Sequence, residues 1–370
     1  MHHHRTLPAV LLATGLLLAA CGTPVTTGAP DSKGSGESTA YAEYDSLTGP
    51  QRTEKLLAAA KKEGGVLDLY TSNTDIQELV DGFQKAYPGI KVRAFRANSE
   101  TVLQRILQEH GARRTNNDVV DTNDIELRAL QDQHVLYEYR GPALAGLKPE
   151  ATKPDGWTAE RFNAFVVGWN TDVVPAGQEP KTFSDLADPK WKGKISVEIG
   201  DWDWYMAMST YLTDEKGWSQ EKVDDVFAKI AKNARQTKGH TVQGEMLSAG
   251  QFGIAASVYS HTLDKAVAKG APVAWRPSVE PVILRPNGLA LMKEPKHPAA
   301  ALLWTDWVLT EGQRVIADSK RIPAAKEVPG FKDPIPPGTE VYSLDKSDAS
   351  DGQKWNSAYD ALLRGVPKND

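Results

Sequence analysis

Between residues 50 and 131, short apolar segments alternate with helix-forming stretches, and this alternation restricts the possible folds more than any other feature of the chain. The pattern predicts strands over 66–70, 90–95 and 118–121, with helices over 51–64, from about 73, around 102–107 and over 123–131. This order is typical of a parallel sheet with helices on both faces. In such sheets, ligands bind beyond the carboxyl ends of the strands.

A second unit of the same kind follows a stretch rich in proline and glycine at 141–157. Strands are predicted over 162–169, 195–199 and 250–259, and helices over about 201–212, 221–235, 260–270 and 297–317. The 370 residues are enough for two domains of ordinary size. No segment of 20–50 residues repeats, which excludes solenoids and propellers. The sequence therefore predicts two α/β units.

The N-terminus predicts the compartment. Arg5 precedes an uncharged, mostly apolar run from Leu7 to Ala20, which is too short for a membrane span of about 20 residues and suits the apolar region of an export signal. Leu18-Ala19-Ala20-Cys21 resembles the lipobox of bacterial lipoproteins. That resemblance implies a signal peptide over 1–20 and lipidation of Cys21, and so an exported protein anchored to the outer face of the bacterial cytoplasmic membrane. An ordinary signal peptide followed by an unrelated cysteine is the alternative.

Composition narrows the function classes further. Residues 21–49 are rich in Gly, Ser, Thr and Pro, and predict a flexible tether that buries too little apolar surface to fold. Cys21 is the single cysteine, so an intrachain disulfide, a cysteine metal cluster and a cysteine nucleophile within the fold are all excluded. The net charge is -5 without any basic block, so we expect no nucleic-acid partner.

A set of short segments between residues 165 and 323 carries a family resemblance. They are Phe165–Thr171, Phe183–Leu186, Pro189–Lys194, Pro286–Gly288, His297–Ala301, Glu311–Gln313 and Arg321–Pro323. In this order they resemble the solute-binding proteins of bacterial ABC importers, of the periplasmic binding protein type 2 class. Within that class the chain looks like the branch that contains the ferric-ion binders and their relatives for organic solutes.

The resemblance implies a fold and a role. Each of two lobes would have a mixed, mostly parallel sheet flanked by helices, and a two-segment hinge would join them. The first lobe would comprise 50–160 plus 280–340, the second 161–279, and a C-terminal segment with a final helix would follow over 341–370. A monomer would close on a small solute and deliver it to the permease and ATPase subunits of an importer.

The sequence departs from the ferric binders at one motif. Those proteins carry an adjacent pair of tyrosines after a strand of the second lobe, whereas this chain reads Val258-Tyr259-Ser260-His261 and has no such pair. The first-strand loop, where some members place a histidine, reads Thr71-Ser72-Asn73. A site for a hard metal built from Tyr259, His261, Asp201 and Asp203 stays open as an alternative.

The main prediction is a small organic solute, cationic or rich in hydroxyl groups. Asp201-Trp202-Asp203-Trp204-Tyr205 begins a helix that faces the cleft by analogy, and offers aromatic surfaces beside two carboxylates. Thr71, Ser72, Asn73 and Asn123 would contribute neutral polar groups from the first lobe, and Tyr259 a phenol from the second. Helix capping for the polar residues and core packing for Trp204 are the alternatives.

An enzyme on the same two-lobe fold is the competing class, and a structural lipoprotein is a third. The chain contains no G-x-S-x-G, H-E-x-x-H, Walker A or G-x-G-x-x-G motif. Paired carboxylates such as Asp201 and Asp203 occur in glycosidases, but their spacing in sequence does not establish the separation that this chemistry needs. We therefore predict a binding protein that is not an enzyme and uses no cofactor or catalytic metal.

Overall fold

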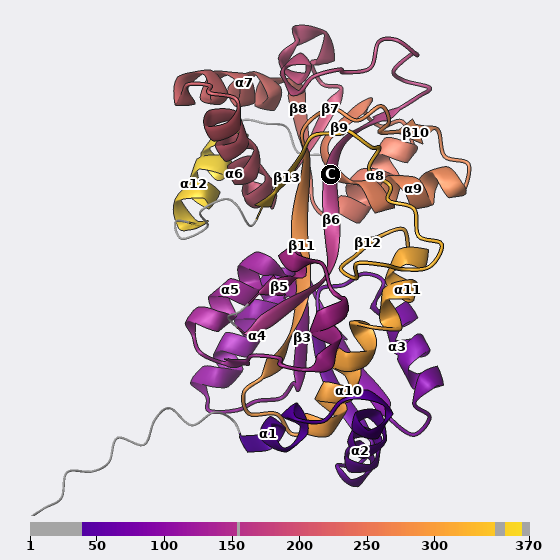
Figure 1. The fold of residues 1–370 in the computed structure, drawn as a ribbon. Helices are drawn as coiled ribbons and strands as arrows, with labels where there is room; N and C mark the ends of the chain where they lie inside the picture. Colours follow the sequence, from indigo (N-terminus) through magenta and orange to yellow (C-terminus); the bar gives the residue numbers. More distant parts are fainter. Residues whose placement is uncertain (1–38, 154–155, 345–351, 365–370) are drawn as a thin grey trace, which may run out of the picture. The chain divides into compact units, whose positions relative to one another are not determined.

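The structure is a computed structural model that describes residues 39–153, 156–344 and 352–364 (Figure 1). The predicted signal peptide, Cys21 and most of the predicted tether lie outside these residues. The end of the tether differs from the prediction, because helix α1 covers Thr39–Asp45. Tyr41 is buried, and its hydroxyl donates a hydrogen bond of 2.8 Å to the carbonyl oxygen of Met292. Tyr41 and Tyr44 supply the apolar surface that folds this segment.

The first lobe is built on β1 (Val66–Thr71), β2 (Lys91–Arg96) and β3 (Val119–Asn123). β1 lies between the other two strands and runs parallel to both, as the sequence predicts. The helices of this lobe are α2 (Gly49–Lys62), α3 (Ile76–Ala86), α4 (Ser99–Gly111), α5 (Asp124–Asp132), α10 (Pro298–Val308) and α11 (Gly312–Asp318). The single helix predicted over 297–317 is thus two helices. Gly312 starts the second one against Trp307, where a Cβ would lie 3.1 Å from the indole.

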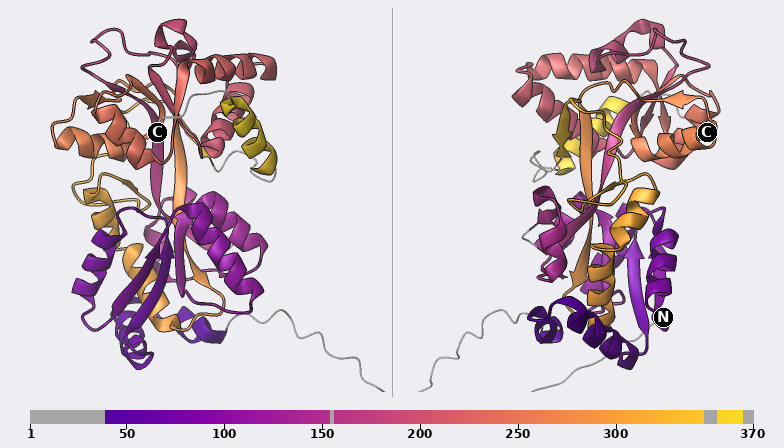
Figure 2. Two further views of the ribbon diagram at one scale, coloured as in Figure 1. Left: turned by 180° about the vertical axis from the view of Figure 1, so that it is seen from behind. Right: turned by 45° about the vertical axis from the view of Figure 1, so that its right-hand side comes forward.

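Two long antiparallel strands, β6 (Trp157–Asn170) and β11 (Val282–Met292), run from one lobe into the other (Figures 1 and 2). One half of β11 pairs with β3 of the first lobe, and one half of β6 pairs with β9 of the second. The register of β11 shifts between Asn287 and Gly288. A side chain at Gly288 has no room, because its Cβ would lie 2.5 Å from the carbonyl oxygen of Thr158. This close approach explains the glycine of the Pro-Asn-Gly segment.

The second lobe contains β7 (Ile195–Glu198), β8 (Ala234–Thr237) and β9 (Ile254–Tyr259), with β7 between the other two and parallel to both. Its helices are α6 (Trp202–Thr210), the π-helix η5 (Tyr211–Glu215), α7 (Gln220–Asn233), α8 (His240–Ser248) and α9 (Ser260–Ala268). The strand order through the described residues is β2-β1-β3-β11-β6-β9-β7-β8. Parallel and antiparallel pairs coexist, so the predicted mixed α/β fold with two lobes is confirmed.

Short elements complete the described chain. They are β4 (Leu136–Tyr137), η1 (Pro142–Gly146), η2 (Pro149–Ala151), β5 (Thr152–Lys153), η3 (Phe183–Ala187), η4 (Pro189–Trp191), β10 (Val273–Ala274), β12 (Ile322–Pro323), β13 (Val341–Ser343) and α12 (Gly352–Leu363). Helix α12 lies where the sequence predicts a final helix. It packs on the second lobe, since Tyr359 and Leu363 join the same apolar cluster as Trp204 and Phe227. Across the described parts of the chain, no helix is both long and apolar enough to cross a membrane.

The predicted boundary between the lobes at residues 160 and 161 falls inside β6, and the boundary at 279 and 280 falls just before β11. Both strands pass between the lobes as continuous extended chain, and every residue of β6 is buried. A strand that belongs to both lobes offers no loop at which to divide them. The described chain therefore changes lobe within β6 and near the middle of β11, where we expect the hinge.

Candidate binding site between the lobes

The carboxyl ends of strands from both lobes converge on the middle of β6 and β11. Asn123, at the end of β3, pairs with Asn287 near the middle of β11, and Tyr259, at the end of β9, pairs with Phe165 near the middle of β6. β7 runs parallel to β9, so its end also points toward the first lobe. This is the edge where α/β sheets bind their ligands. The predicted site residues all lie at or beside these strand ends.

The side chains of the predicted first-lobe loop, residues 71–73, form hydrogen bonds mainly within the loop itself. Thr71 and Asn73 are buried; the hydroxyl of Thr71 accepts a hydrogen bond of 2.9 Å from the backbone N–H of Asn73. The side-chain oxygen of Asn73 accepts another of 2.9 Å from the backbone N–H of Asp75. Ser72 is half-buried and shares a hydrogen bond of 3.0 Å with Thr122. The side chains of Thr71 and Asn73 therefore hold the loop, and their contact with a solute stays a prediction.

The aromatic residues at the start of α6 also differ from the prediction. Trp204 is 2% exposed and makes edge contacts with Phe183 and Phe227, at ring-centroid distances of 6.0 and 5.8 Å. Tyr205 is buried against Phe227 and stacks on Tyr359 of α12 at 5.6 Å.

Trp202 is half-buried, packs on the same apolar cluster and lies against Gly352 at the start of α12. The helix α12 thus covers much of the aromatic surface that the sequence suggested was open to a ligand. Trp204 and Tyr205 pack in the core of the second lobe. Trp202 packs on the same cluster but is half-buried, so contact of these aromatic residues with a solute stays a prediction.

The two carboxylates of the same segment do lie at the interface between the lobes. Asp203 of α6 accepts a hydrogen bond of 2.5 Å from Nη1 of Arg285 on β11, and both side chains are buried. The guanidinium of Arg285 lies 4.8 Å from the ring of Phe165 and 5.3 Å from that of Tyr259. Arg285 thereby connects the crossing strand to the second lobe by one charged bond and two cation–π contacts.

Asp201, which precedes α6, pairs with His240, a residue that was not predicted as part of the site. Nε2 of His240 lies 2.9 Å from Oδ1 of Asp201. Burial raises the pKa of Asp201 to about 6, although the charge of His240 lowers it in part. Burial lowers the pKa of His240, but the charge and hydrogen bond of Asp201 outweigh this effect, so its pKa is raised. Both carboxylate oxygens of the neighbouring Glu198 accept backbone N–H groups, from Gly200 and Gly239.

Tyr259 stands in the centre of an aromatic group. Its ring lies 3.8 Å from that of His240, 5.0 Å from that of Phe165 and 5.3 Å from that of His261. Burial, together with the charges of Arg321 and Lys265, holds the pKa of His261 well below its usual range. Of the four residues in the hard-metal alternative, Tyr259 and His261 are brought together, whereas Asp203 is occupied by Arg285.

Buried carboxylate oxygens without a hydrogen-bond partner gather at this interface. Within the described residues they include both oxygens of Asp124 and Oε2 of Glu126 on α5, and Oδ2 of Asp201 in the second lobe. Oδ2 of Asp121 also lacks a hydrogen bond, although Arg161 lies beside that carboxylate and pairs with Glu160 as well. A buried carboxylate oxygen without a hydrogen-bond donor costs folding free energy, so Asp124, Glu126 and Asp201 are candidate ligands for a cation.

The pKa of Asp124, in the first lobe, depends on a charge in the second lobe. Burial raises its pKa to about 7; the charge of Arg128 lowers it in part, and that of Asp203 raises it. Nε of Arg128 stays 3.6 Å from Asp124, which is an ion-pair distance rather than a hydrogen bond. Burial also raises the pKa of Glu126. The acids of α5 in the first lobe therefore lie within electrostatic reach of those of α6 in the second.

A second ion-pair group holds the lobes together beside the crossing strands. Asp75, before α3, binds Nζ of Lys265 from α9 at 2.8 Å and Nε of Arg321 at 2.8 Å. Burial tends to raise the pKa of Asp75, but the charges of Arg321 and Lys265 lower it overall. Arg161, fully buried beside Asp121, has its pKa lowered to about 10 by burial. These side chains pair with one another and are structural.

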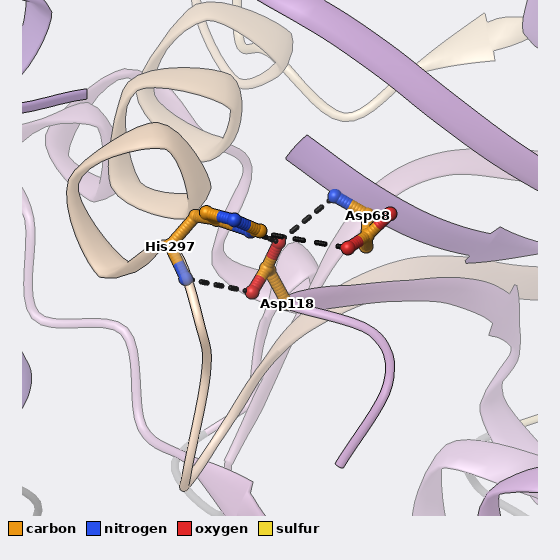
Figure 3. A group of neighbouring side chains, drawn as sticks. All are labelled: Asp68, Asp118 and His297. Carbon is orange, nitrogen blue, oxygen red and sulfur yellow. Dashed lines mark hydrogen bonds and ion pairs between the residues drawn. The ribbon is translucent and has the colours of Figure 1, made fainter. Parts of the chain in front are cut away.

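A different carboxylate–histidine cluster lies in the first lobe, at the start of α10 (Figure 3). Nδ1 of His297 is 2.8 Å from Oδ2 of Asp118 and 3.9 Å from Oδ2 of Asp68. Asp118 accepts backbone N–H groups of Asp68, Lys296 and His297 at 2.8, 2.8 and 2.9 Å. Arg93 binds both oxygens of Asp68. These partners satisfy the cluster, so it holds the start of α10 and offers no vacant ligand set.

A cavity of about 330 Å³ is also remote from the predicted site. It is lined by the end of α4, by residues 133–135 and by residues 292–294 after β11. Because β11 runs antiparallel to β3, its end lies at the opposite edge of the first-lobe sheet from Asn123. None of the predicted site residues lines this cavity, so it is not the solute site inferred from the strand ends.

The bacterial extracellular solute-binding protein family matches residues 70–315 of the chain, from the end of β1 to α11, and so includes both lobes. The chain belongs to this family. Membership confirms the predicted class, a binding protein rather than an enzyme.

Relatives and solved structures indicate which branch of the family the chain resembles. Iron uptake protein A1 of Synechocystis sp. is 30% identical over 210 residues, which are 54% of this chain and 56% of that protein. The Fe(3+)-binding periplasmic protein of Serratia marcescens is 28% identical over 197 residues, 52% of this chain and 56% of that protein. The chain thus spans about half the length of the curated relatives it matches. The crystal structure of iron-bound HitA from Pseudomonas aeruginosa shares the fold, with a TM-score of 0.66, 21% identity and coverage of 80% of this chain and 99% of that one. The resemblance to the ferric-binding branch is confirmed.

Sequence reasoning missed the charged residues that dominate the interface. Asp124 and Glu126 follow Asn123 directly, and their position in the first turn of a helix is ordinary for acidic residues. Arg285 carried a clearer signal, since it interrupts the apolar strand Val282-Ile283-Leu284. His240 gave no signal, because α8 itself was not predicted.

Proposed function

We propose that this protein is the exported solute-binding component of an ABC importer, which captures its solute between the two lobes and delivers it to permease and ATPase subunits. Family membership and the two crossing strands support this role. We expect a monomer that closes by bending at β6 and β11. Small-angle scattering with and without solute tests closure: the radius of gyration falls on binding, and an unchanged value at saturation would count against it.

The solute that the interface supports best is a cation, with ferric iron as the first candidate. The observation that carries this proposal is the group of buried, unpartnered carboxylate oxygens on Asp124, Glu126 and Asp201, contributed by both lobes. Carboxylate oxygens are hard ligands and suit a hard, highly charged ion. The names of the two curated relatives, an iron uptake protein and a ferric-binding protein, favour the same ion.

Titration of the purified protein with ferric nitrilotriacetate tests the proposal. Asp124→Asn and Asp201→Asn each remove one negative charge beside the ion, and we expect each to weaken binding about tenfold to a hundredfold. Asp225→Asn is the matched control, since it removes the same charge from a carboxylate that forms an exposed ion pair with Lys229 on α7. Parental affinity in both interface variants would reject the cation site.

An organic cation or hydroxyl-rich solute is the second candidate. It is favoured by a specific observation: a single phenol, Tyr259, is followed by Ser260 and His261, where ferric binders carry two adjacent tyrosines. The ring of Tyr259 lies at the end of β9 among His240, Phe165 and His261, so its phenol is placed at the interface where a solute would bind. Native mass spectrometry of freshly purified protein separates the candidates, because a retained organic molecule and a retained iron ion differ in mass.

We also propose that Cys21 is acylated and holds the protein on the outer face of the cytoplasmic membrane. Support comes from Leu18-Ala19-Ala20-Cys21 at the end of the apolar run. Cys21→Ser removes the only thiol, so it is expected to release the protein from the membrane fraction or leave the signal uncleaved. Unchanged fractionation and mass in that variant would refute the anchor.

A further inference from the structure

Three asparagine side chains form a continuous line of hydrogen bonds from Arg321 to the predicted site. Nη1 of Arg321 donates to Oδ1 of Asn163 on β6 at 2.8 Å. Nδ2 of Asn163 donates to Oδ1 of Asn287 on β11 at 2.7 Å, and Nδ2 of Asn287 donates to Oδ1 of Asn123 at 2.6 Å. Asn163 and Asn287 are 4% and 1% exposed, so this amide relay is buried up to its last member.

Arg321, the first residue of the relay, determines which end of each amide donates and which accepts. A guanidinium has donors and no acceptor, so Asn163 must turn its oxygen toward Arg321 and its NH₂ group toward Asn287. Asn287 must then accept from Asn163 and donate to Asn123. The donors of Arg321 therefore determine the orientation of each amide, although the oxygen and nitrogen of an amide are nearly alike in shape. Arg321 is itself held by Asp75 and Thr74, at 2.8 and 3.0 Å.

The relay ends at Asn123, whose NH₂ group is a free donor. Asn123 occupies the position before α5 where asparagine often caps a helix, yet its side chain makes no capping hydrogen bond. Its oxygen is used by Asn287, and its NH₂ group has no partner among the described residues. Unlike the other two asparagines, Asn123 is half-buried rather than buried. The relay therefore leaves two N–H bonds at the edge of the interface.

We propose that Arg321, acting through Asn163 and Asn287, orients Asn123 so that it offers only N–H donors to the solute. Asn123 then contacts an acceptor oxygen of the solute, such as a hydroxyl, carboxylate or phosphate oxygen, and supplies no oxygen ligand to a cation. Asn163, Asn287 and Arg321 are positioning residues, since they act through Asn123. This inference rests on the proposed solute site, but its test uses solute-free protein, so it does not depend on which solute is bound.

Side-chain amide exchange in solute-free protein labelled with ¹⁵N-asparagine tests the relay. Asn123→Ala, Asn163→Ala and Asn287→Ala each remove one NH₂ signal and so assign it. In the parental protein the NH₂ groups of Asn163 and Asn287 are expected to exchange at least about tenfold more slowly than that of Asn123, because they are buried and bonded. An Asn123 NH₂ group as protected as the other two would overturn the proposal.

Asn287→Asp tests the direction without altering Asn123. A carboxylate at position 287 still accepts from Asn163 but cannot donate, so Asn123 must turn its NH₂ group toward it and its oxygen toward the solute. The Asn123 NH₂ signal is then expected to become protected at least about tenfold. Asn116→Asp, which adds the same charge beside Lys296, is the control and should leave it unchanged. Unchanged exchange of Asn123 in folded Asn287→Asp would contradict the relay.

Discussion

Two carboxylate–histidine clusters in this protein have similar composition and different chemistry. Asp118 and His297 at the start of α10 are surrounded by partners, and Asp118 accepts backbone N–H groups from Asp68, Lys296 and His297. At the interface between the lobes, Asp201 pairs with His240, but its second oxygen and both oxygens of Asp124 lack any hydrogen bond in the described chain.

The difference shows that the type of residue does not identify a binding site. A carboxylate that accepts several backbone donors already has its stabilising partners, and it holds the chain together. A buried carboxylate without partners is costly in the solute-free protein, and the cost is recovered when a cation arrives. Substitution in the first cluster should therefore lower stability, whereas substitution in the second should lower affinity.

The largest expected effect is that of Asp118→Ala. It leaves three backbone N–H groups and the His297 ring without their acceptor, so we expect the free energy of unfolding to fall by about 3–5 kcal/mol. Urea unfolding measures the loss. The variant that remains folded should bind ferric nitrilotriacetate with parental affinity, and a loss of affinity with unchanged stability would reverse the roles of the two clusters.

The second-largest expected effect is the change in the free energy of unfolding with pH that Asp124 causes. Its pKa is raised to about 7 from 3.8, so the folded protein binds this proton more tightly than the unfolded chain. Its contribution is complete below about pH 4 and is lost as the pH rises to about 7. Relative to Asp124→Asn, the solute-free parental protein should lose about 2–4 kcal/mol between pH 4 and pH 8. Parallel urea-unfolding profiles for the two proteins would contradict this.

Cation affinity should depend on pH in the opposite direction. A bound cation favours the ionised form of Asp124, so parental affinity for ferric nitrilotriacetate should rise between pH 5.5 and pH 7.5, by about 25-fold at most. The comparison is made against Asp124→Asn in the same buffers, which cancels changes in iron chemistry. An identical rise in both proteins would remove Asp124 from the site.

The smallest expected effect is that of His297→Gln. Glutamine retains a donor near Asp118, so we expect a loss of about 1 kcal/mol in the free energy of unfolding and no change in solute affinity. Thermal unfolding and the ferric titration check the two parts. A metal ion that purifies with the parental protein and is lost in His297→Gln would show that the first cluster binds a metal after all.

The sequence was sufficient to predict the fold because the pattern of strands and helices is local. Ile76, Leu79, Val80 and Phe83 repeat at helical spacing and are buried on α3. The division at residue 160 was less accurate, because β6 continues through both lobes and a continuous apolar strand carries no boundary signal. Helix α1 was missed, since two tyrosines in a polar segment give a weak pattern.

The sequence predicted where the candidate site lies better than it predicted which side chains form it. Asn123, Asp201, Asp203 and Tyr259 do lie at the facing strand ends, because topology places those ends together. The burial of Tyr205 under α12 was not predicted, because a sequence does not show that α12 will cover α6. The pairing of Arg285 with Asp203 joins residues far apart in the chain, and no local pattern predicts it.

The most direct test of the cation site is an anomalous difference map, recorded at the iron edge, from crystals of protein loaded with ferric citrate. We predict one strong peak between α5 and α6, within coordination distance of carboxylate oxygens of Asp124 and Asp201. A peak beside Asp118 and His297, or no ordered iron between the lobes, would contradict the account.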